Sequence, residues 1–193
     1  RNTQNAYYAD GGKGGQPLRI INESLGMVAR GHTVTILCPE SAPLHQMAQA
    51  AGLTVVTMPL KRKNLSNLMR LRRWLLEQGN NIDVINSHNS ADTWLVALAN
   101  LTLANPIPLV RTRHASGVPR NNWTTRWLFR TACAHIVTTG EALRHQMTAL
   151  GVPLEQTTSV PSGVDTQRFY PDDKYDARAY CELSQNDFWL GVV

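Results

Sequence analysis

Two histidines and two arginines stand where they could do chemistry. His88 directly follows one strand-like run, and His114 follows another with Arg111 and Arg113 beside it. An imidazole exchanges a proton near neutral pH or hydrogen-bonds a hydroxyl group, and a guanidinium binds phosphate through a planar fork of donors. A histidine at a strand end has a structural alternative, in which it caps a helix or bonds a neighbouring carbonyl. Because the two histidines follow neighbouring strands, we expect them to share a site.

A glycine pair precedes the first helical pattern of the chain. Gly14 and Gly15 are followed by Gln16 and Pro17, and proline suits the first turn of a helix. A backbone without side chains can approach a ligand closely, and the unpaired N–H groups of a helix start bind phosphate. The structural alternative is that the two glycines only turn the chain. We predict a ligand-facing loop.

Further polar residues follow the predicted strands in the same way: Asn89, Ser90, Thr139, Gly163 and Asp165. In a parallel sheet, ligands bind beyond the carboxyl ends of the strands, so these residues are expected to face the same crevice as the glycine pair. Thr139 has a structural alternative, because its hydroxyl can cap the helix that follows it.

Strand-like and helix-like segments alternate along the chain. Strands are predicted over 33–38, 53–58, 83–87, 108–112, 135–138 and 157–160. Helices are predicted over 16–30, 44–51, 65–78, 91–104, 123–133 and 141–150. In the first helix, Leu18, Ile21, Leu25 and Val28 recur on one face, and Gly31 is placed at its end. This alternation predicts a Rossmann-like, doubly wound α/β domain whose sheet is mainly parallel, with helices on both faces.

Composition limits the class of protein. With 193 residues, of which 42% are hydrophobic and 17% charged, the chain can bury a core, and its net charge of +5 favours anionic partners. We find no apolar run of about 18 residues, so we expect a cytoplasmic protein without a membrane span. Cys38, Cys133 and Cys181 are odd in number and far apart, which indicates reduced thiols in the core and no metal site.

A basic patch lies between the second and third predicted strands. It contains Lys61, Arg62, Lys63, Arg70 and Arg73. Such a run is usually a solvated face, and the sharper interpretation is contact with an anionic membrane surface at the inner face of the membrane. No motif of a nucleic-acid-binding domain accompanies these charges, so we predict no nucleic-acid partner.

The predicted domain organisation has three parts. Residues 1–13 are a polar stretch that forms a poor or missing first strand, 14–183 form the α/β domain, and 184–193 begin a second domain. The segment 161–174 is rich in Pro, Gly and Asp and is interpreted as a linker, and 187–193 is interpreted as a new apolar strand.

The ordered motifs resemble the N-terminal half of family 4 glycosyltransferases. They are Gly14-Gly15, Arg30-Gly31-His32, residues 83–88, residues 110–114, and residues 160–165 with Phe169 and Pro171. The resemblance implies a GT-B enzyme with two Rossmann-like domains. Such an enzyme transfers a sugar from a nucleotide donor with retention at the anomeric carbon, generally without a metal or other cofactor. The N-terminal domain mainly holds the acceptor, and the C-terminal domain holds the donor.

The resemblance also implies roles for single residues. His114 would lie beside the transferred sugar as the catalytic residue, and Gly14 and Gly15 would lie against the donor diphosphate. Gly163 and Asp165 would belong to the junction between the two domains. The family's carboxylate pair for the donor belongs to the C-terminal domain, and this sequence stops before it, so we expect the 193 residues to be inactive alone.

Three functions follow as hypotheses. The leading one is the acceptor half of a retaining hexosyltransferase that acts on a cell-envelope glycan or glycolipid such as lipopolysaccharide. The second is a non-catalytic, Rossmann-like binding fragment or pseudoenzyme. The third is a dinucleotide-dependent oxidoreductase, for which Gly12 and Gly14 begin a glycine motif, but Pro17 stands in the place of its third small residue.

Overall fold

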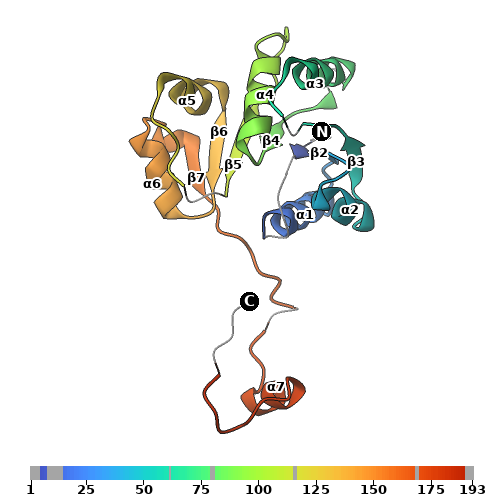
Figure 1. Ribbon diagram of the computed structural model, residues 1–193, viewed down its shortest axis with the longest axis vertical. Helices are drawn as coiled ribbons and strands as arrows, with labels where there is room; N and C mark the ends of the chain where they lie inside the picture. Colours follow the sequence, from blue (N-terminus) through green and yellow to red (C-terminus); the bar gives the residue numbers. More distant parts are fainter. Residues whose placement is uncertain are drawn as a thin grey trace. The chain divides into compact units, whose positions relative to one another are not determined.

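The computed structural model describes residues 5–7, 15–60, 62–78, 81–114, 117–167 and 170–189 (Figure 1). The chain divides into two compact units, Arg1–Pro161 and Ser162–Val193. The strands are β1 (Asn5–Tyr7), β2 (Val34–Cys38), β3 (Thr54–Thr57), β4 (Ile85–Ser87), β5 (Leu109–Arg113), β6 (His135–Thr138) and β7 (Thr157–Ser159). The α-helices are α1 (Gly15–Val28), α2 (Pro43–Ala50), α3 (Leu65–Gln78), α4 (Ser90–Asn100), α5 (Trp123–Trp127), α6 (Glu141–Ala149) and α7 (Lys174–Tyr180). The π-helix η2 (Leu128–Ala132) continues α5, and the 3-10 helix η3 (Leu154–Gln156) precedes β7.

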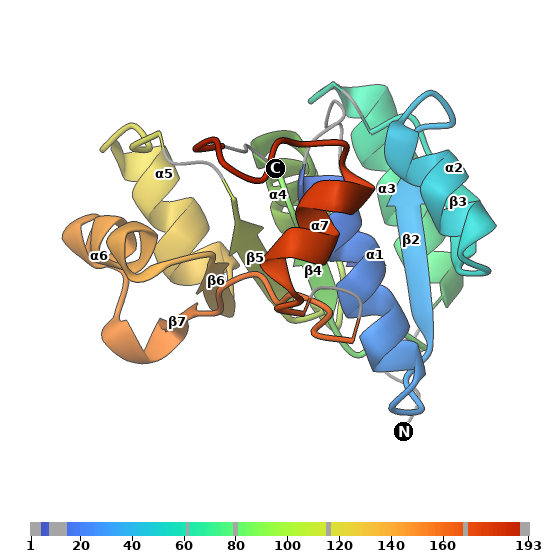
Figure 2. The same ribbon diagram turned by 90° about the horizontal axis from the view of Figure 1, so that it is seen from below.

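All pairings between the described strands are parallel. One sheet has the order β1-β2-β3 and the other has the order β4-β5-β6-β7. The strand β1 also contacts β4, which brings the two sheets edge to edge. Figure 2 shows β7, β6, β5 and β4 following one another in this order. The short strand β1 lies within residues 1–13, where the sequence indicated a poor or missing strand.

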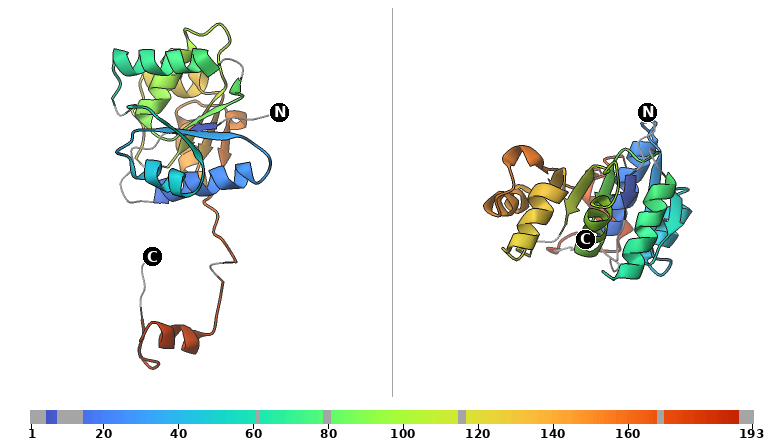
Figure 3. Two further views of the ribbon diagram at one scale, coloured as in Figure 1. Left: turned by 90° about the vertical axis from the view of Figure 1, so that its right-hand side faces the viewer. Right: turned by 90° about the horizontal axis from the view of Figure 1, so that it is seen from above.

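Helices cover both faces of the sheets. Figure 3 shows α1 and α2 on one face and α3 and α4 on the opposite face. The members of each pair pack against each other. Each crossover between parallel strands therefore contains a helix that packs on the sheet, as the alternating sequence pattern requires. The predicted doubly wound, Rossmann-like α/β fold is confirmed.

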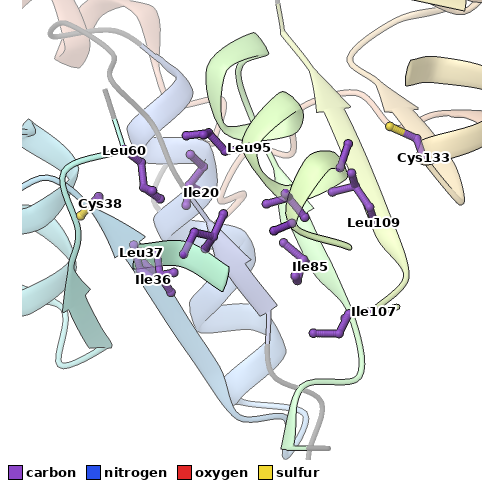
Figure 4. Close-up of a cluster of buried hydrophobic side chains, with 14 of the residues drawn as sticks. Ile20, Ile36, Leu37, Cys38, Leu60, Ile85, Leu95, Ile107, Leu109 and Cys133 are labelled. Atoms are coloured by element: carbon purple, nitrogen blue, oxygen red, sulfur yellow. The ribbon is translucent and has the colours of Figure 1, made fainter. Parts of the chain in front are cut away.

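The core lies between the sheets and these helices. All five residues of β2 are buried, which is typical of a strand covered on both faces. Ile36 of β2 and Ile20 of α1 are fully buried, and Leu37 and Leu60 are each 2% exposed. Ile85, Leu95 and Leu109 belong to the same buried cluster (Figure 4). No helix in the described part of the chain is long and apolar enough to cross a membrane.

Glycines end two helices, and the one at Gly31 was predicted. Gly31 follows α1 with a φ of +84°, and Gly52 follows α2 with a φ of +72°. Both values lie in the left-handed region, which costs a residue with a Cβ about 1–2 kcal/mol. After Gly31, His32 N donates to Met27 O at 3.1 Å, so the end of α1 closes on its own carbonyl groups.

The predicted apolar face of the first helix is confirmed at Ile21 and wrong at its other three residues. Leu18, Leu25 and Val28 are 56%, 40% and 44% exposed, and the buried residues of α1 are Pro17, Arg19, Ile20, Ile21 and Ser24. The two faces are adjacent on the helix, and the one that fits against β2 includes Arg19. Arg19 can be buried on this face because its guanidinium has polar partners, Val160 O and Glu23.

The second unit also differs from the sequence prediction. The division between units falls after Pro161, so the predicted boundary between residues 183 and 184 lies inside the second unit. Residues 187–189 of the predicted strand 187–193 form no strand, and 190–193 lie outside the described residues. A strand needs a partner for its backbone, and Phe188 is instead 90% exposed. Helix α7 begins where the predicted linker ends, and Cys181 after it is exposed instead of lying in a core.

Candidate functional site

The two predicted histidines form a hydrogen-bonded pair. His88 follows β4 and His114 follows β5, which are neighbouring parallel strands. His88 Nδ1 lies 2.9 Å from His114 Nε2, and the rings stack with centroids 5.2 Å apart. One of these nitrogens donates a proton and the other accepts it, so the bond requires at least one neutral ring. The predicted proximity of the two histidines is confirmed, and their shared role in a site stays a prediction.

Both imidazoles are neutral near pH 7. Burial lowers the pKa of His88 well below 6.5, and the charges of His114, Arg111 and Arg19 lower it further. Burial also lowers the pKa of His114 to about 4, with smaller contributions from Arg19 and Arg111. His88 is 2% exposed, whereas His114 is only partly buried. His114 is therefore the member of the pair that can offer its second nitrogen, Nδ1, to a ligand.

A buried carboxylate positions the loop that carries His88. Asp92 Oδ2 accepts from His88 N at 3.0 Å, and Oδ1 accepts from Asn89 N at 3.0 Å and from Thr93 N at 2.7 Å. Asn89 Oδ1 in turn accepts from Ala91 N at 3.0 Å, and together these bonds form a capping box at the start of α4. Burial raises the pKa of Asp92 to about 6, while Arg111 and the backbone donors oppose that rise.

The start of α1 reaches the same edge of the sheet. Gly15 is the first residue of α1, and Gln16 Nε2 donates to His88 O at 3.3 Å. Arg19 is 6% exposed and donates from Nη2 to Val160 O at 2.8 Å, beyond the end of β7. Arg19 also pairs with Glu23, with Nε 2.6 Å from Oε1. The helix start, which favours anions, thus lies next to the histidine pair.

Arg111 and Arg113 lie on β5 and are each 6% exposed. Arg111 Nη1 lies 4.0 Å from Asp92 Oδ1. Arg113 Nη2 donates to Gly117 O and contacts Gln146 Oε1 at 3.5 Å. Both arginines line a cavity of about 390 Å³. Its other lining residues are Lys63, Ser90, Thr93, Trp94, Pro119, Arg120, Thr125, Leu128 and Phe129.

The remaining predicted site residues are distributed as follows. Ser90 lines the cavity, and Asn89 caps α4. Thr139 lies between β6 and α6, apart from the residues that line the cavity. Its predicted alternative as a helix cap is wrong, because Gly140 is the N-cap of α6 and no side chain caps it.

Four further predicted residues belong to the second unit or fall outside the described residues. Gly163 and Asp165 belong to the second unit, where Asp165 Oδ1 accepts from Gln167 N at 3.0 Å. Gly14 and Lys61 lie outside the described residues. Their predicted contacts stay predictions.

Sequence reasoning missed Arg19 and Asp92. An arginine at a position next to Ile20 and Ile21 is a signal, since a charge on the packed face of a helix needs a buried partner. Asp92 stands three residues after Asn89, which is the spacing of a capping box. Arg120 and Trp94 of the cavity carried no signal in the sequence, because they become neighbours of β5 only through packing.

Solved structures share this architecture. A glycosyltransferase from Rickettsia africae aligns with a TM-score of 0.74 at 14% identity, over 96% of this chain and 51% of that chain. Anabaena HepE in complex with UDP and glucose aligns with a TM-score of 0.67 at 14% identity, over 94% of this chain and 50% of HepE. The lipopolysaccharide outer core galactosyltransferase WaaB aligns with a TM-score of 0.63 at 14% identity, over 84% of this chain and 46% of WaaB. The chain spans about half the length of these proteins and has the fold of one half of a GT-B glycosyltransferase.

The sequence matches the family model described as Glycosyltransferase Family 4 over residues 13–168, and the chain belongs to this family. No curated protein matches the sequence. Membership argues against the dinucleotide-dependent oxidoreductase that Gly12 and Gly14 left open.

Proposed function

We propose that this chain forms the acceptor-binding half of a retaining hexosyltransferase that uses a nucleotide-sugar donor. The acceptor is a glycan or glycolipid of the cell envelope. The observation that carries the proposal is the pair of neutral histidines at the carboxyl edge of the sheet, next to the start of α1 and close to the arginines of the cavity. HepE was crystallised with UDP and glucose, and WaaB is described as a galactosyltransferase, which supports a nucleotide-sugar donor by similarity of fold.

The geometry supports a division of roles. As the glycosidic bond of the donor breaks, negative charge grows on the leaving diphosphate, and backbone N–H groups aimed at that charge stabilise the transition state. The start of α1 at Gly15 offers such groups, and Gln16 connects it to the His88 backbone. Neutral His114 then hydrogen-bonds a hydroxyl group of the transferred sugar through its Nδ1 atom. His88 holds the ring of His114 in place and fixes which of its nitrogens carries the proton.

The test is an assay of the full-length gene product. We expect transfer from one member of a panel of nucleotide sugars, with the anomeric configuration of the product, determined by NMR, equal to that of the donor. His114→Ala is expected to lower kcat/KM about a hundredfold, and His145→Ala, an exposed histidine on α6, should leave it unchanged. Binding of a nucleotide sugar without transfer would support the non-catalytic alternative. An inverted product would refute the retaining mechanism.

Two finer predictions complete the proposal. The nucleotide sugar acts as a substrate, and no resident cofactor or metal takes part. The protein associates peripherally with an anionic membrane through the exposed side of α3, where Arg70 and Arg73 stand among Leu65, Met69 and Leu76. Leu65 is 71% exposed, and Met69 and Leu76 are each 51% exposed. Basic and apolar side chains together suit the interface of a bilayer.

A further inference from the structure

The cavity beside β5 has an unusual concentration of positive charge. It is lined by Lys63, Arg111, Arg113 and Arg120, and no carboxylate side chain is among its described lining residues. Lys63 and Arg120 are exposed, whereas the two arginines of β5 are buried. Four cations around one cavity repel one another, so the arrangement is most stable when an anion lies among them.

The two buried guanidinium groups retain hydrogen-bonding capacity. Within the part of the chain that the structure describes, Arg111 Nη1 and Arg113 Nε are buried and have no acceptor. Asp92 Oδ1 lies 4.0 Å from Arg111 Nη1, and the Asp92 oxygens already accept from the backbone N–H groups of His88, Asn89 and Thr93. A buried donor without an acceptor costs free energy, and a guanidinium binds an oxyanion through two parallel hydrogen bonds.

Other lining residues of the cavity suit a sugar ring. Trp94 and Phe129 contribute aromatic surface, and Trp94 is held by stacking on Trp127 with ring centroids 5.8 Å apart. Ser90 and Thr125 add hydroxyl groups. The volume of about 390 Å³ lies within the range of small-molecule sites, which begins at about 300 Å³. By contrast, the apolar cavity of about 20 Å³ beneath α3 is too small for a sugar.

We propose that this cavity binds an oxyanion carried by the sugar acceptor, held by Arg111, Arg113, Lys63 and Arg120 while the sugar ring lies against Trp94. The inference rests on the proposed function, because it identifies the chemical class of the acceptor. The oxyanion is a phosphate ester or a carboxylate, since a guanidinium recognises both. The cavity adjoins the residue after β5, so an acceptor anchored there would hold a hydroxyl near His114.

The test measures binding of three probes to the chain: glucose 6-phosphate, glucuronate and glucose. Binding is followed by calorimetry and by the indole signal of Trp94 in NMR spectra. The variant Lys63→Gln with Arg120→Gln removes the two exposed cations and leaves the buried arginines in place. The matched control, Arg30→Gln with Lys174→Gln, makes the same change in net charge at exposed positions outside the cavity.

We expect glucose 6-phosphate to bind the wild-type chain and to perturb Trp94. The double variant in the cavity should bind about tenfold more weakly, through the loss of two partly exposed charge contacts. Affinity should fall in about 1 M salt, where the Debye length is about 3 Å. The control variant should bind glucose 6-phosphate with the affinity of the wild type. Tighter binding of glucuronate with the same dependence on Lys63 and Arg120 would support the inference and assign the oxyanion as a carboxylate.

Two results would overturn the inference. One is that glucose binds as tightly as both charged probes, and the other is that the cavity variant binds like the control. Failure here is distinguishable from failure of the proposed function. Transfer by the full-length protein to a neutral acceptor, with a KM unaffected by the cavity variant, would refute the inference alone. Probe binding by a full-length protein that transfers no sugar would refute the proposed function alone.

Discussion

Acidification is expected to destabilise the chain through His114. Its pKa in the folded chain is about 4 instead of 6.5, first because of burial and then because of Arg19 and Arg111. The unfolded chain therefore binds a proton at a higher pH than the folded chain does. The stability that neutral His114 contributes is fully present above pH 6.5 and is lost as the pH falls from 6.5 towards 4.

The expected magnitude follows from these two pKa values. Because the pKa of His114 differs between the folded and the unfolded chain, acidification from about pH 7 to about pH 5 lowers the free energy of unfolding by about 2 kcal/mol. His114 is only partly buried, so solvent screens the charge of its protonated form. We therefore expect the loss attributable to His114 to be about 1 kcal/mol.

The assay is urea unfolding followed by circular dichroism at the two pH values. His114→Gln keeps a polar group beside His88 but does not titrate, and His145→Gln removes an exposed histidine of α6 as a control. On acidification, the free energy of unfolding of the wild type and of the control should fall by about 1 kcal/mol more than that of His114→Gln. His88 is present in all three proteins. If the stability of the wild type and of His114→Gln falls in parallel, the reasoning about the histidine pair is refuted.

Three further predictions concern the fold, the membrane and the chemistry. Gly31→Ala should lower the free energy of unfolding by about 1–2 kcal/mol, because φ is +84° at Gly31. The control Gly163→Ala should change it by less than about 0.5 kcal/mol, and equal urea midpoints of the two variants would contradict this prediction. Arg70→Gln with Arg73→Gln should weaken cosedimentation with phosphatidylserine vesicles about thirtyfold, at about 1 kcal/mol for each charge, and unchanged binding would exclude α3 as the contact. Incubation of the full-length enzyme with EDTA should leave the transfer rate unchanged, and a loss restored by a divalent cation would contradict the prediction of a metal-free reaction.

The sequence by itself determined the elements and their order. Apolar periodicity and glycines at helix ends are local signals, so the helices α1 to α6 and the strands β2 to β7 could be predicted close to their observed positions. It also predicted that two candidate site residues lie close together. In a parallel sheet all strands end at the same edge, and this topological rule was sufficient to bring His88 and His114 together.

Local signals were weaker at the ends of the chain. Asn5–Tyr7 has no apolar run, yet it pairs with β2, because a central position in a sheet can be filled by a short strand that its neighbours hold. The apolar run at 187–193 predicted a strand, but no described neighbour pairs with its residues 187–189. A strand depends on partners distant in sequence, which composition does not reveal.

Only the tertiary structure decided which side chains became buried and charged neighbours. The apolar face of α1 and the adjacent face with Arg19 are both compatible with a helix. The structure buries the face with Arg19, whose guanidinium donates to the carbonyl of Val160, 141 positions further along the chain. The hydrogen bond between the histidines, the carboxylate of Asp92 beneath them and the cations around the cavity depend on packing in the same way. Distances of a few ångströms between side chains determine pKa values and binding, and they arise from the packing of the whole domain, so spacing along the chain cannot supply them.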